Sequence, residues 1–170
     1  FDKDTYCCPN NFRRAIALLP QLVYYRTGNG VLINLYTVSS ARIDLPNGVI
    51  ISVRQKTNYP NSGQVVLHID PSERTEFEVT LRIPGWCEKA TINGDPVEPG
   101  MFITLCRTWS AGDRITIEFS MPWRLVRGRQ AQAGRVAVMR GPMVYCFNTT
   151  ANEEMKTLRP TGLHRMCLDP

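Results

Sequence analysis

The hydrophobic pattern of the chain changes its period near Gly30. Before this residue, apolar side chains recur at helical spacing, at Phe12, Ile16, Leu19 and Val23. The spacing predicts one helix from Asn11 to about Tyr25, with Asn10 or Asn11 as its N-cap and Gly28 as its stop. Pro20 lies inside this range and is expected to kink or split the helix, because proline lacks a backbone N–H and clashes with the preceding turn.

After Gly30, apolar and polar residues alternate, which is typical of half-buried β-strands. Seven segments show the pattern: 31–36, 49–53, 65–69, 77–83, 101–105, 115–119 and 136–139. Turn-forming residues such as Asn93-Gly94-Asp95 separate them. Seven or more short strands without an intervening helical pattern predict an antiparallel β-sandwich.

Length and composition fit one domain with an additional piece. The chain has 170 residues, of which 43% are hydrophobic and 21% charged, so it can bury a core. It opens with Phe1 and reaches a helix about ten residues later, and we expect it to be a piece of a longer protein. The predicted parts are a helical segment at 1–27, a sandwich domain at 28–147, and a linker or edge tail at 148–170.

Several classes of partner are not expected. No apolar run reaches the roughly 20 residues that cross a bilayer, and no secretory signal is visible, so we expect no membrane partner. The net charge is +5, and arginines cluster within 123–140. They alternate there with apolar residues, as on half-exposed strands, so no nucleic-acid partner is expected. The cellular location is left open, because an export signal would lie outside this sequence.

Six cysteines are spread along the chain: Cys7, Cys8, Cys87, Cys106, Cys146 and Cys167. They lack the dense spacing of a small disulfide scaffold. Cys87, Cys106 and Cys146 fall in or beside apolar strand segments and are expected to be buried thiols. A disulfide between Cys87 and Cys106 is left open.

Cys7 and Cys8 stand at the expected helix start, where unpartnered N–H groups favour a thiolate. A thiolate is both a strong nucleophile and a zinc ligand. Structural zinc takes four ligands, however, and His68 and His164 are at no familiar metal spacing. The residues alone therefore favour two ordinary cysteines, with a vicinal disulfide as an alternative. No other catalytic motif is present.

Aromatic residues offer a second candidate chemistry. Trp86, Trp109 and Trp123 carry rings that can stack on a sugar face. Each lies at the edge of a predicted strand, and sandwich cores need large aromatic residues, so packing is the expected role of all three. His68, between Leu67 and Ile69, is expected to point outward.

Four longer motifs occur in a fixed order along the chain: YCCPNNFRR at 6–14, LRIPGWC at 81–87, RTWSAGDRITIEFSMPWR at 107–124 and GRVAVMRGPMVYC at 134–146. Together they resemble the carboxy-terminal part of bacterial glycoside hydrolase family 127, the β-L-arabinofuranosidase group. The resemblance runs from Tyr6 to about Cys146.

The resemblance implies an (α/α)6 barrel followed by β-sandwich domains, in retaining glycosidases that act on arabinose-like sugars of plant glycans. It implies a cysteine nucleophile, a glutamate acid/base, and zinc held by three cysteines and a glutamate. By position, Cys7 resembles the nucleophile, which also binds zinc, and Cys8 resembles a second zinc ligand. The family's third cysteine and both glutamates lie upstream of its CCP motif, where this chain has only Phe1 to Tyr6.

The expected fold class is therefore mostly β, an antiparallel sandwich preceded by a remnant helix of a truncated (α/α)6 barrel. The expected function is that of an accessory piece of a zinc-dependent glycosidase, inactive and without tightly bound zinc by itself. Its expected partners are the missing amino-terminal α-barrel of the same protein, which Tyr36 and Arg42 are expected to face, and a plant-derived glycan. A carbohydrate-binding module and a purely structural or oligomerisation domain are the alternatives, and the subunit count is left open.

Overall fold

The computed structural model describes residues 7–146. The chain forms two compact units, Phe1–Pro122 and Trp123–Pro170. The sandwich range expected from the sequence, 28–147, extends across this boundary, and the expected tail at 148–170 lies outside the described residues. The two units are therefore described one at a time.

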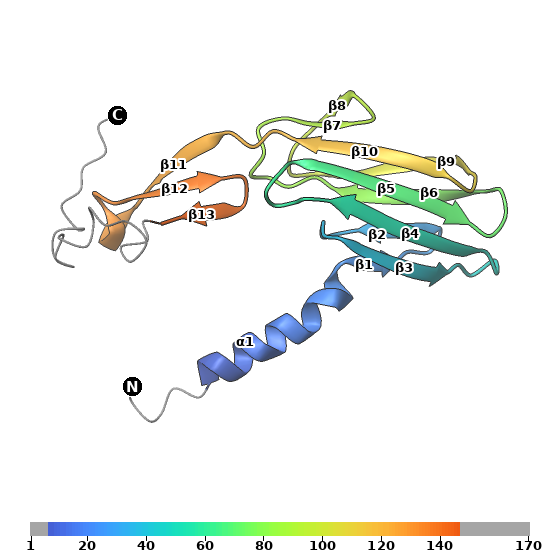
Figure 1. Ribbon diagram of the computed structural model, residues 1–170, viewed down its shortest axis with the longest axis horizontal. Helices are drawn as coiled ribbons and strands as arrows, with labels where there is room; N and C mark the ends of the chain where they lie inside the picture. The colour runs from blue at the N-terminus through green and yellow to red at the C-terminus, as the bar shows by residue number, and fades with distance from the viewer. Residues whose placement is uncertain (1–6, 147–170) are drawn as a thin grey trace. The chain divides into compact units, whose positions relative to one another are not determined.

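The first unit begins with a helical segment that is split as predicted. Helix α1 spans Cys7–Leu18 (Figure 1). It passes into the 3₁₀ helix η1 (Leu19–Leu22), which contains Pro20. The helix starts at Cys7 rather than after Asn10, so Cys7 and Cys8 belong to its first turn. Pro9 is compatible with this start, because the first N–H groups of a helix have no partner to lose.

Two sheets follow the helical segment (Figure 1). In the first sheet the strand order is β1 (Tyr24–Arg26), β2 (Gly30–Ile33), β6 (Thr75–Arg82) and β9 (Phe102–Trp109). In the second it is β3 (Ser39–Asp44), β4 (Ile50–Thr57), β5 (Gln64–Pro71), β10 (Asp113–Phe119), β7 (Ala90–Ile92) and β8 (Asp95–Val97).

All neighbouring strands of these two sheets run antiparallel except β2 and β6, which pair in parallel from Gly30 opposite Glu78 to Ile33 opposite Leu81. The mostly β, largely antiparallel fold is thus confirmed. The helix prediction was wrong for Tyr24 and Tyr25, which form β1 beside β2. Once Pro20 has ended the regular helix, pairing with β2 gives this backbone its hydrogen bonds.

The inner faces of the two sheets form one hydrophobic core. On β5, Val65, Leu67 and Ile69 are fully buried, while His68 points to the outer face, as the alternation predicted. Burying each such aliphatic side chain contributes about 1.5–3 kcal/mol. The core is therefore the main source of stability in this unit.

Tyr36 was expected to face the missing barrel, and the structure places it elsewhere. It is buried in the core, and its hydroxyl donates to the carbonyl oxygen of Arg82 at 2.8 Å. Its ring lies 5.1 Å from that of Phe119. A tyrosine can join the core because its one polar atom has found a backbone acceptor. Arg42, the other residue expected to face the barrel, is exposed on β3.

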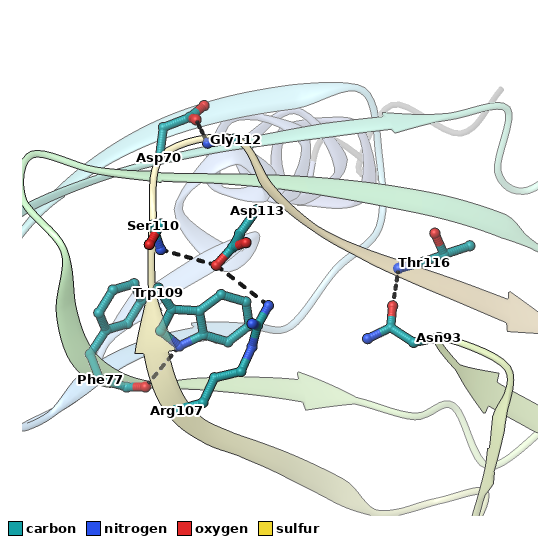
Figure 2. Close-up of polar contacts among 9 residues, drawn as sticks. All are labelled: Asp70, Phe77, Asn93, Arg107, Trp109, Ser110, Gly112, Asp113 and Thr116. Atoms are coloured by element: carbon teal, nitrogen blue, oxygen red, sulfur yellow. Dashed lines mark hydrogen bonds and ion pairs between the residues drawn. The ribbon is translucent and has the colours of Figure 1, made fainter.

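Trp109 is the largest of the fully buried side chains. Its indole N–H donates to the carbonyl oxygen of Phe77 at 2.9 Å, and the two rings stack at 5.7 Å (Figure 2). The guanidinium of Arg107 lies 3.9 Å from the centre of the Trp109 ring. The residue thus joins β9 to β6 and fills the core, in agreement with the packing role predicted for it.

The turn between β9 and β10 is fixed by two carboxylates (Figure 2). Asp113 accepts the backbone N–H of Ser110 at 3.0 Å and pairs with Arg107 at 3.5 Å. Asp70, on β5, accepts the backbone N–H of Gly112 at 2.7 Å. These bonds fix the connection by which the chain passes from β9 in the first sheet to β10 in the second.

Gly30 is needed where β2 approaches β6. A Cβ atom at this position would overlap the carbonyl oxygen of Glu78. The backbone N–H of Glu78 also donates to the carbonyl oxygen of Asn29 at 3.0 Å. The glycine therefore permits the close parallel pairing of the two strands.

The second unit contains a three-stranded antiparallel sheet. Its strands are β11 (Trp123–Arg127), β12 (Val136–Arg140) and β13 (Met143–Tyr145), with the short 3₁₀ helix η2 (Gln130–Gln132) between the first two. The strand predicted at 136–139 is confirmed as β12. Within residues 7–146, no helix has the length and hydropathy that crossing a bilayer requires.

Candidate functional site

The two adjacent thiols form the site that the sequence analysis singled out. Cys7 and Cys8 are both exposed and free in the first turn of α1, and their Sγ atoms lie 3.8 Å apart. Two thiolates on one tetrahedral zinc ion, each about 2.3 Å from the metal, lie about 3.8 Å from each other. The spacing of the pair therefore fits two positions of a tetrahedral zinc site.

The rest of such a site is not supplied by the described residues. Across residues 7–146, no three His, Cys, Asp or Glu side chains are grouped so that they could hold a metal ion. His68 lies on the outer face of β5, and His164 lies outside the described residues. Among the described residues, the two thiols therefore have no third ligating side chain beside them.

The helix that carries the thiols has an apolar face that no described residue of its unit covers. Phe12, Ile16 and Leu19 lie on one side at helical spacing and are 67%, 51% and 44% exposed. None of the residues in α1 is buried. An amphipathic helix normally places such a stripe against a core, so this face is suited to packing against further protein.

The remaining described cysteines differ from one another. Cys87 is buried, as predicted, and its thiol donates to the carbonyl oxygen of Pro84 at 2.9 Å. Burial raises the pKa of the Cys87 thiol. The prediction of burial was wrong for Cys106 and Cys146, which are exposed, and the open question of a Cys87–Cys106 disulfide is answered because both thiols are free.

Cys106 is exposed because of its phase on β9. Ile103 and Leu105 point toward the core, so the next residue points outward. Its Sγ lies 3.8 Å from a carboxylate oxygen of Glu76. Partial desolvation, together with the carboxylates of Glu76 and Glu78, raises the pKa of the Cys106 thiol.

Sequence reasoning missed one surface hollow, which contains Glu76 and Glu78. Both line a hollow of about 400 Å³ together with Cys106, Asn29 and Asn47. The available signal was the i, i+2 spacing of the two glutamates, which places them on one face of β6. Finding Cys106 beside them required knowing that β9 pairs with β6.

The three tryptophans occupy different environments. Trp109 is fully buried, and Trp86 packs against the core with its ring stacked 6.4 Å from that of Tyr59. Trp123, in the second unit, is 60% exposed and lies 4.6 Å from the ring of Tyr145. Packing is therefore the role of the first two, whereas Trp123 presents an open ring.

The first unit thus combines a helical segment that carries two adjacent free thiols with two β-sheets that share one core. Residues 30–121 match the model for the middle domain of glycoside hydrolase family 127, described as β-L-arabinofuranosidase, and residues 126–167 match the model for the carboxy-terminal domain of that family. The chain belongs to glycoside hydrolase family 127.

Individual relatives agree with this assignment. A non-reducing end β-L-arabinofuranosidase of Bifidobacterium longum subsp. longum is 32% identical over 161 residues, an alignment that covers 86% of this chain and 24% of the relative. The crystal structure of a family-127 β-L-arabinofuranosidase from Geobacillus stearothermophilus T6 matches with a TM-score of 0.74 at 35% identity, covering 86% of this chain and 24% of that one. A third, a family-127 β-arabinofuranosidase, matches with a TM-score of 0.69 at 32% identity, covering 82% and 26%. This chain thus spans about a quarter of the length of these relatives.

Proposed function

We propose that this chain is the part of a retaining glycosidase that supplies the cysteine nucleophile and two zinc ligands. The observation that carries the proposal is the pair of exposed thiols on α1, with Sγ atoms 3.8 Å apart. The substrate class, β-L-arabinofuranosides or related plant glycans, is taken from what the relatives are named for. The family membership supports it.

In the proposed reaction, the Cys7 thiolate attacks the anomeric carbon of the sugar. A bond forms between Sγ and this carbon as the glycosidic carbon–oxygen bond breaks, and the leaving oxygen takes a proton from a general acid. Water then displaces the sulfur as thiolate and gives its proton to the conjugate base of the general acid, so that two inversions give net retention. A zinc ion bound by Cys7 and Cys8 would keep the sulfur deprotonated and make it a better leaving group.

The proposal assigns the general acid and the remaining zinc ligands to an α-barrel of the same protein. The exposed apolar face of α1 supports this arrangement, since it provides a surface for such a barrel to pack on. The sandwich then serves as a packing domain. In this proposal the described residues supply two of four zinc ligands and no general acid, so we expect this chain by itself to show no turnover and weak zinc binding.

The test compares Cys7→Ser and Cys8→Ser with Cys106→Ser in the full-length enzyme. Cys106 is the matched control, because it is an exposed free thiol on the sandwich. We expect Cys7→Ser to abolish hydrolysis of an aryl β-L-arabinofuranoside and Cys8→Ser to lower the bound zinc measured by mass spectrometry, with Cys106→Ser unchanged. Full activity of Cys7→Ser, or a full-length enzyme without zinc, would overturn the proposal.

A second candidate function, carbohydrate binding, is favoured only by the exposed ring of Trp123 beside Tyr145. Aromatic faces of this kind can stack on sugar rings. Calorimetric titration of arabino-oligosaccharides into the chain and its Trp123→Ala variant tests it. Heat that is lost in the variant would support a binding role, and no heat in either protein would exclude it.

A further inference from the structure

Asn34 contacts the end of the helical segment. Its side-chain Nδ2 donates to the carbonyl oxygen of Leu22 at 2.9 Å, and its backbone N–H donates to that of Val23 at 2.9 Å. Leu22 is the last residue of η1, and Val23 is buried. Carbonyl groups at the end of a helix have no partner within the helix. Asn34 therefore holds two of the groups that end the segment carrying the thiols.

Asn34 is in turn fixed to the sandwich. The Nε of Arg82, at the end of β6, donates to the carbonyl oxygen of Asn34 at 2.6 Å. The carbonyl oxygen of Arg82 accepts the hydroxyl of the buried Tyr36 at 2.8 Å. Residues 34 and 36 are thus tied to the same residue of β6.

Leu35, between them, is held from the second sheet. The side chain of Gln55 on β4 donates to the carbonyl oxygen of Leu35 at 3.1 Å. Gln55 is only 1% exposed and is a polar residue inside an otherwise apolar core, so its position is set by the packing around it. The short segment 34–36, which bonds to the end of the helical segment, is therefore itself anchored to both sheets.

The distance from this anchor to the thiols makes the attachment important. α1 and η1 together run from Cys7 to Leu22, with 12 and 4 residues. At about 1.5 Å per α-helical residue and about 2.0 Å per 3₁₀ residue, the segment is about 26 Å long. A rotation of about 5° at its carboxyl end moves its amino end by about 2 Å, and a misplacement of about 1 Å can cost a reaction about a hundredfold in rate.

We propose that Asn34 is a positioning residue for the Cys7 nucleophile: it ties the carboxyl end of the helical segment to the sandwich and so sets where the thiols lie. The inference rests on the proposed function, because that function gives Cys7 a task that requires accurate placement. It assigns the sandwich a part in the reaction through geometry. Asn34 itself touches no substrate in this role.

The first test measures the attachment in this chain by amide hydrogen exchange. Asn34→Ala removes the donor, and Asn34→Asp keeps the shape while placing an oxygen opposite the Leu22 carbonyl. We expect the amides of Val23 and Leu35 to exchange about tenfold faster or more in both variants. Asn47→Asp is the matched control, since Asn47 uses only its Oδ1, which accepts the N–H of Val49 at 3.1 Å and is kept in aspartate.

The second test uses the full-length enzyme. We expect both Asn34 variants to lower kcat about tenfold or more, with KM within about twofold and Tm close to that of Asn47→Asp. The split between kcat and KM distinguishes positioning of the nucleophile from a general loss of folded protein.

Parallel measurement of Cys7→Ser separates the two proposals. If Cys7→Ser is inactive while the Asn34 variants match Asn47→Asp in kcat, the positioning role is overturned and the proposed function stands. If Cys7→Ser keeps full activity, the proposed function fails and the positioning role fails with it. Unchanged exchange at Val23 and Leu35 overturns the positioning role in either case.

Discussion

The indole N–H of Trp109 reaches the carbonyl oxygen of Phe77 across the β9–β6 pair, with the two rings stacked beside the bond. Replacing Trp109 by Phe removes this hydrogen bond and leaves unfilled volume in the core. We expect the free energy of unfolding to fall by about 2–4 kcal/mol, as measured by urea denaturation. Trp123→Phe, at an exposed position, is expected to change it by no more than about 0.5 kcal/mol. Equal effects of the two changes would contradict the core role of Trp109.

Gly30→Ala tests the close approach of β2 and β6. The new methyl group would overlap the carbonyl oxygen of Glu78, so one strand must move and the parallel pair must weaken. We expect a loss of about 3 kcal/mol in the free energy of unfolding. Gly28→Ala is the control, because no atom lies within 4 Å of a Cβ atom at that position. It should leave the stability unchanged or raise it by up to about 1 kcal/mol.

Tyr36 makes the stability of the sandwich depend on pH in the alkaline range. Burial raises the pKa of its phenol, an effect that the charge of Arg82 partly opposes. The folded state therefore keeps a proton that the unfolded chain releases above its ordinary pKa of about 10. The free energy of unfolding is expected to be level with respect to this group below about pH 9 and to fall as the pH rises above about 10.

The Tyr36→Phe variant separates this effect from other alkaline transitions. It should lose about 1 kcal/mol near pH 7, because the hydroxyl no longer donates to the carbonyl oxygen of Arg82. Its free energy of unfolding should then fall less steeply above pH 10, as followed by urea denaturation between pH 8 and 11.5. Parallel curves for the two proteins would show that Tyr36 does not titrate as its burial requires.

The cysteines should differ in their rate of alkylation by iodoacetamide at pH 8. Cys7 and Cys8 are exposed, whereas Cys87 is buried and has a raised pKa. We expect Cys87 to react about a hundredfold more slowly in the folded chain, with the difference lost in urea, as read by mass spectrometry of the peptides. A Cys87 that reacts as fast as Cys7 in the folded chain would mean that the core is open at that position.

Polar substitutions on α1 should leave the stability of this chain nearly unchanged but lower that of the full-length enzyme. Phe12→Gln with Ile16→Gln removes exposed apolar groups, so the stability of this chain should change by no more than about 0.5 kcal/mol. In the full-length enzyme the same pair should lower Tm by several degrees, because the helix would have lost its packing face. Arg14→Gln, a change of a polar residue on the same helix, is the control for both. A Tm equal to that control would remove the evidence for a barrel on this face.

Much of this fold follows from local pattern, and the failures have specific causes. The seven predicted strands form because alternation marks half-buried strands independently of their partners. The parallel pairing of β2 with β6 depends on contacts between distant residues, and no local pattern encodes it. Cys106 was misplaced because the strand predicted at 101–105 was read too short, whereas its continuation to Trp109 fixes the outward phase. Short strands such as β7 carry too few residues for alternation to be visible.

The candidate site shows a similar division. Cys7 and Cys8 were found because they are adjacent in sequence and carried by a family motif. Asn34 was not found from the sequence, because its role depends on hydrogen bonds with Leu22 and Arg82, which are distant from it along the chain. Residues that act by holding other residues leave little trace in a single sequence.

The parallel β2–β6 pair joins two strands that are synthesised at different times. β2 is synthesised before β3, β4 and β5, and its neighbour β6 only after them. Arg82, which donates to the carbonyl oxygen of Asn34, is the last residue of β6. Pairings between such distant segments form slowly. Cys7 and Cys8 are therefore synthesised before β6, and the bond between Arg82 and Asn34 that anchors segment 34–36 can form only afterwards.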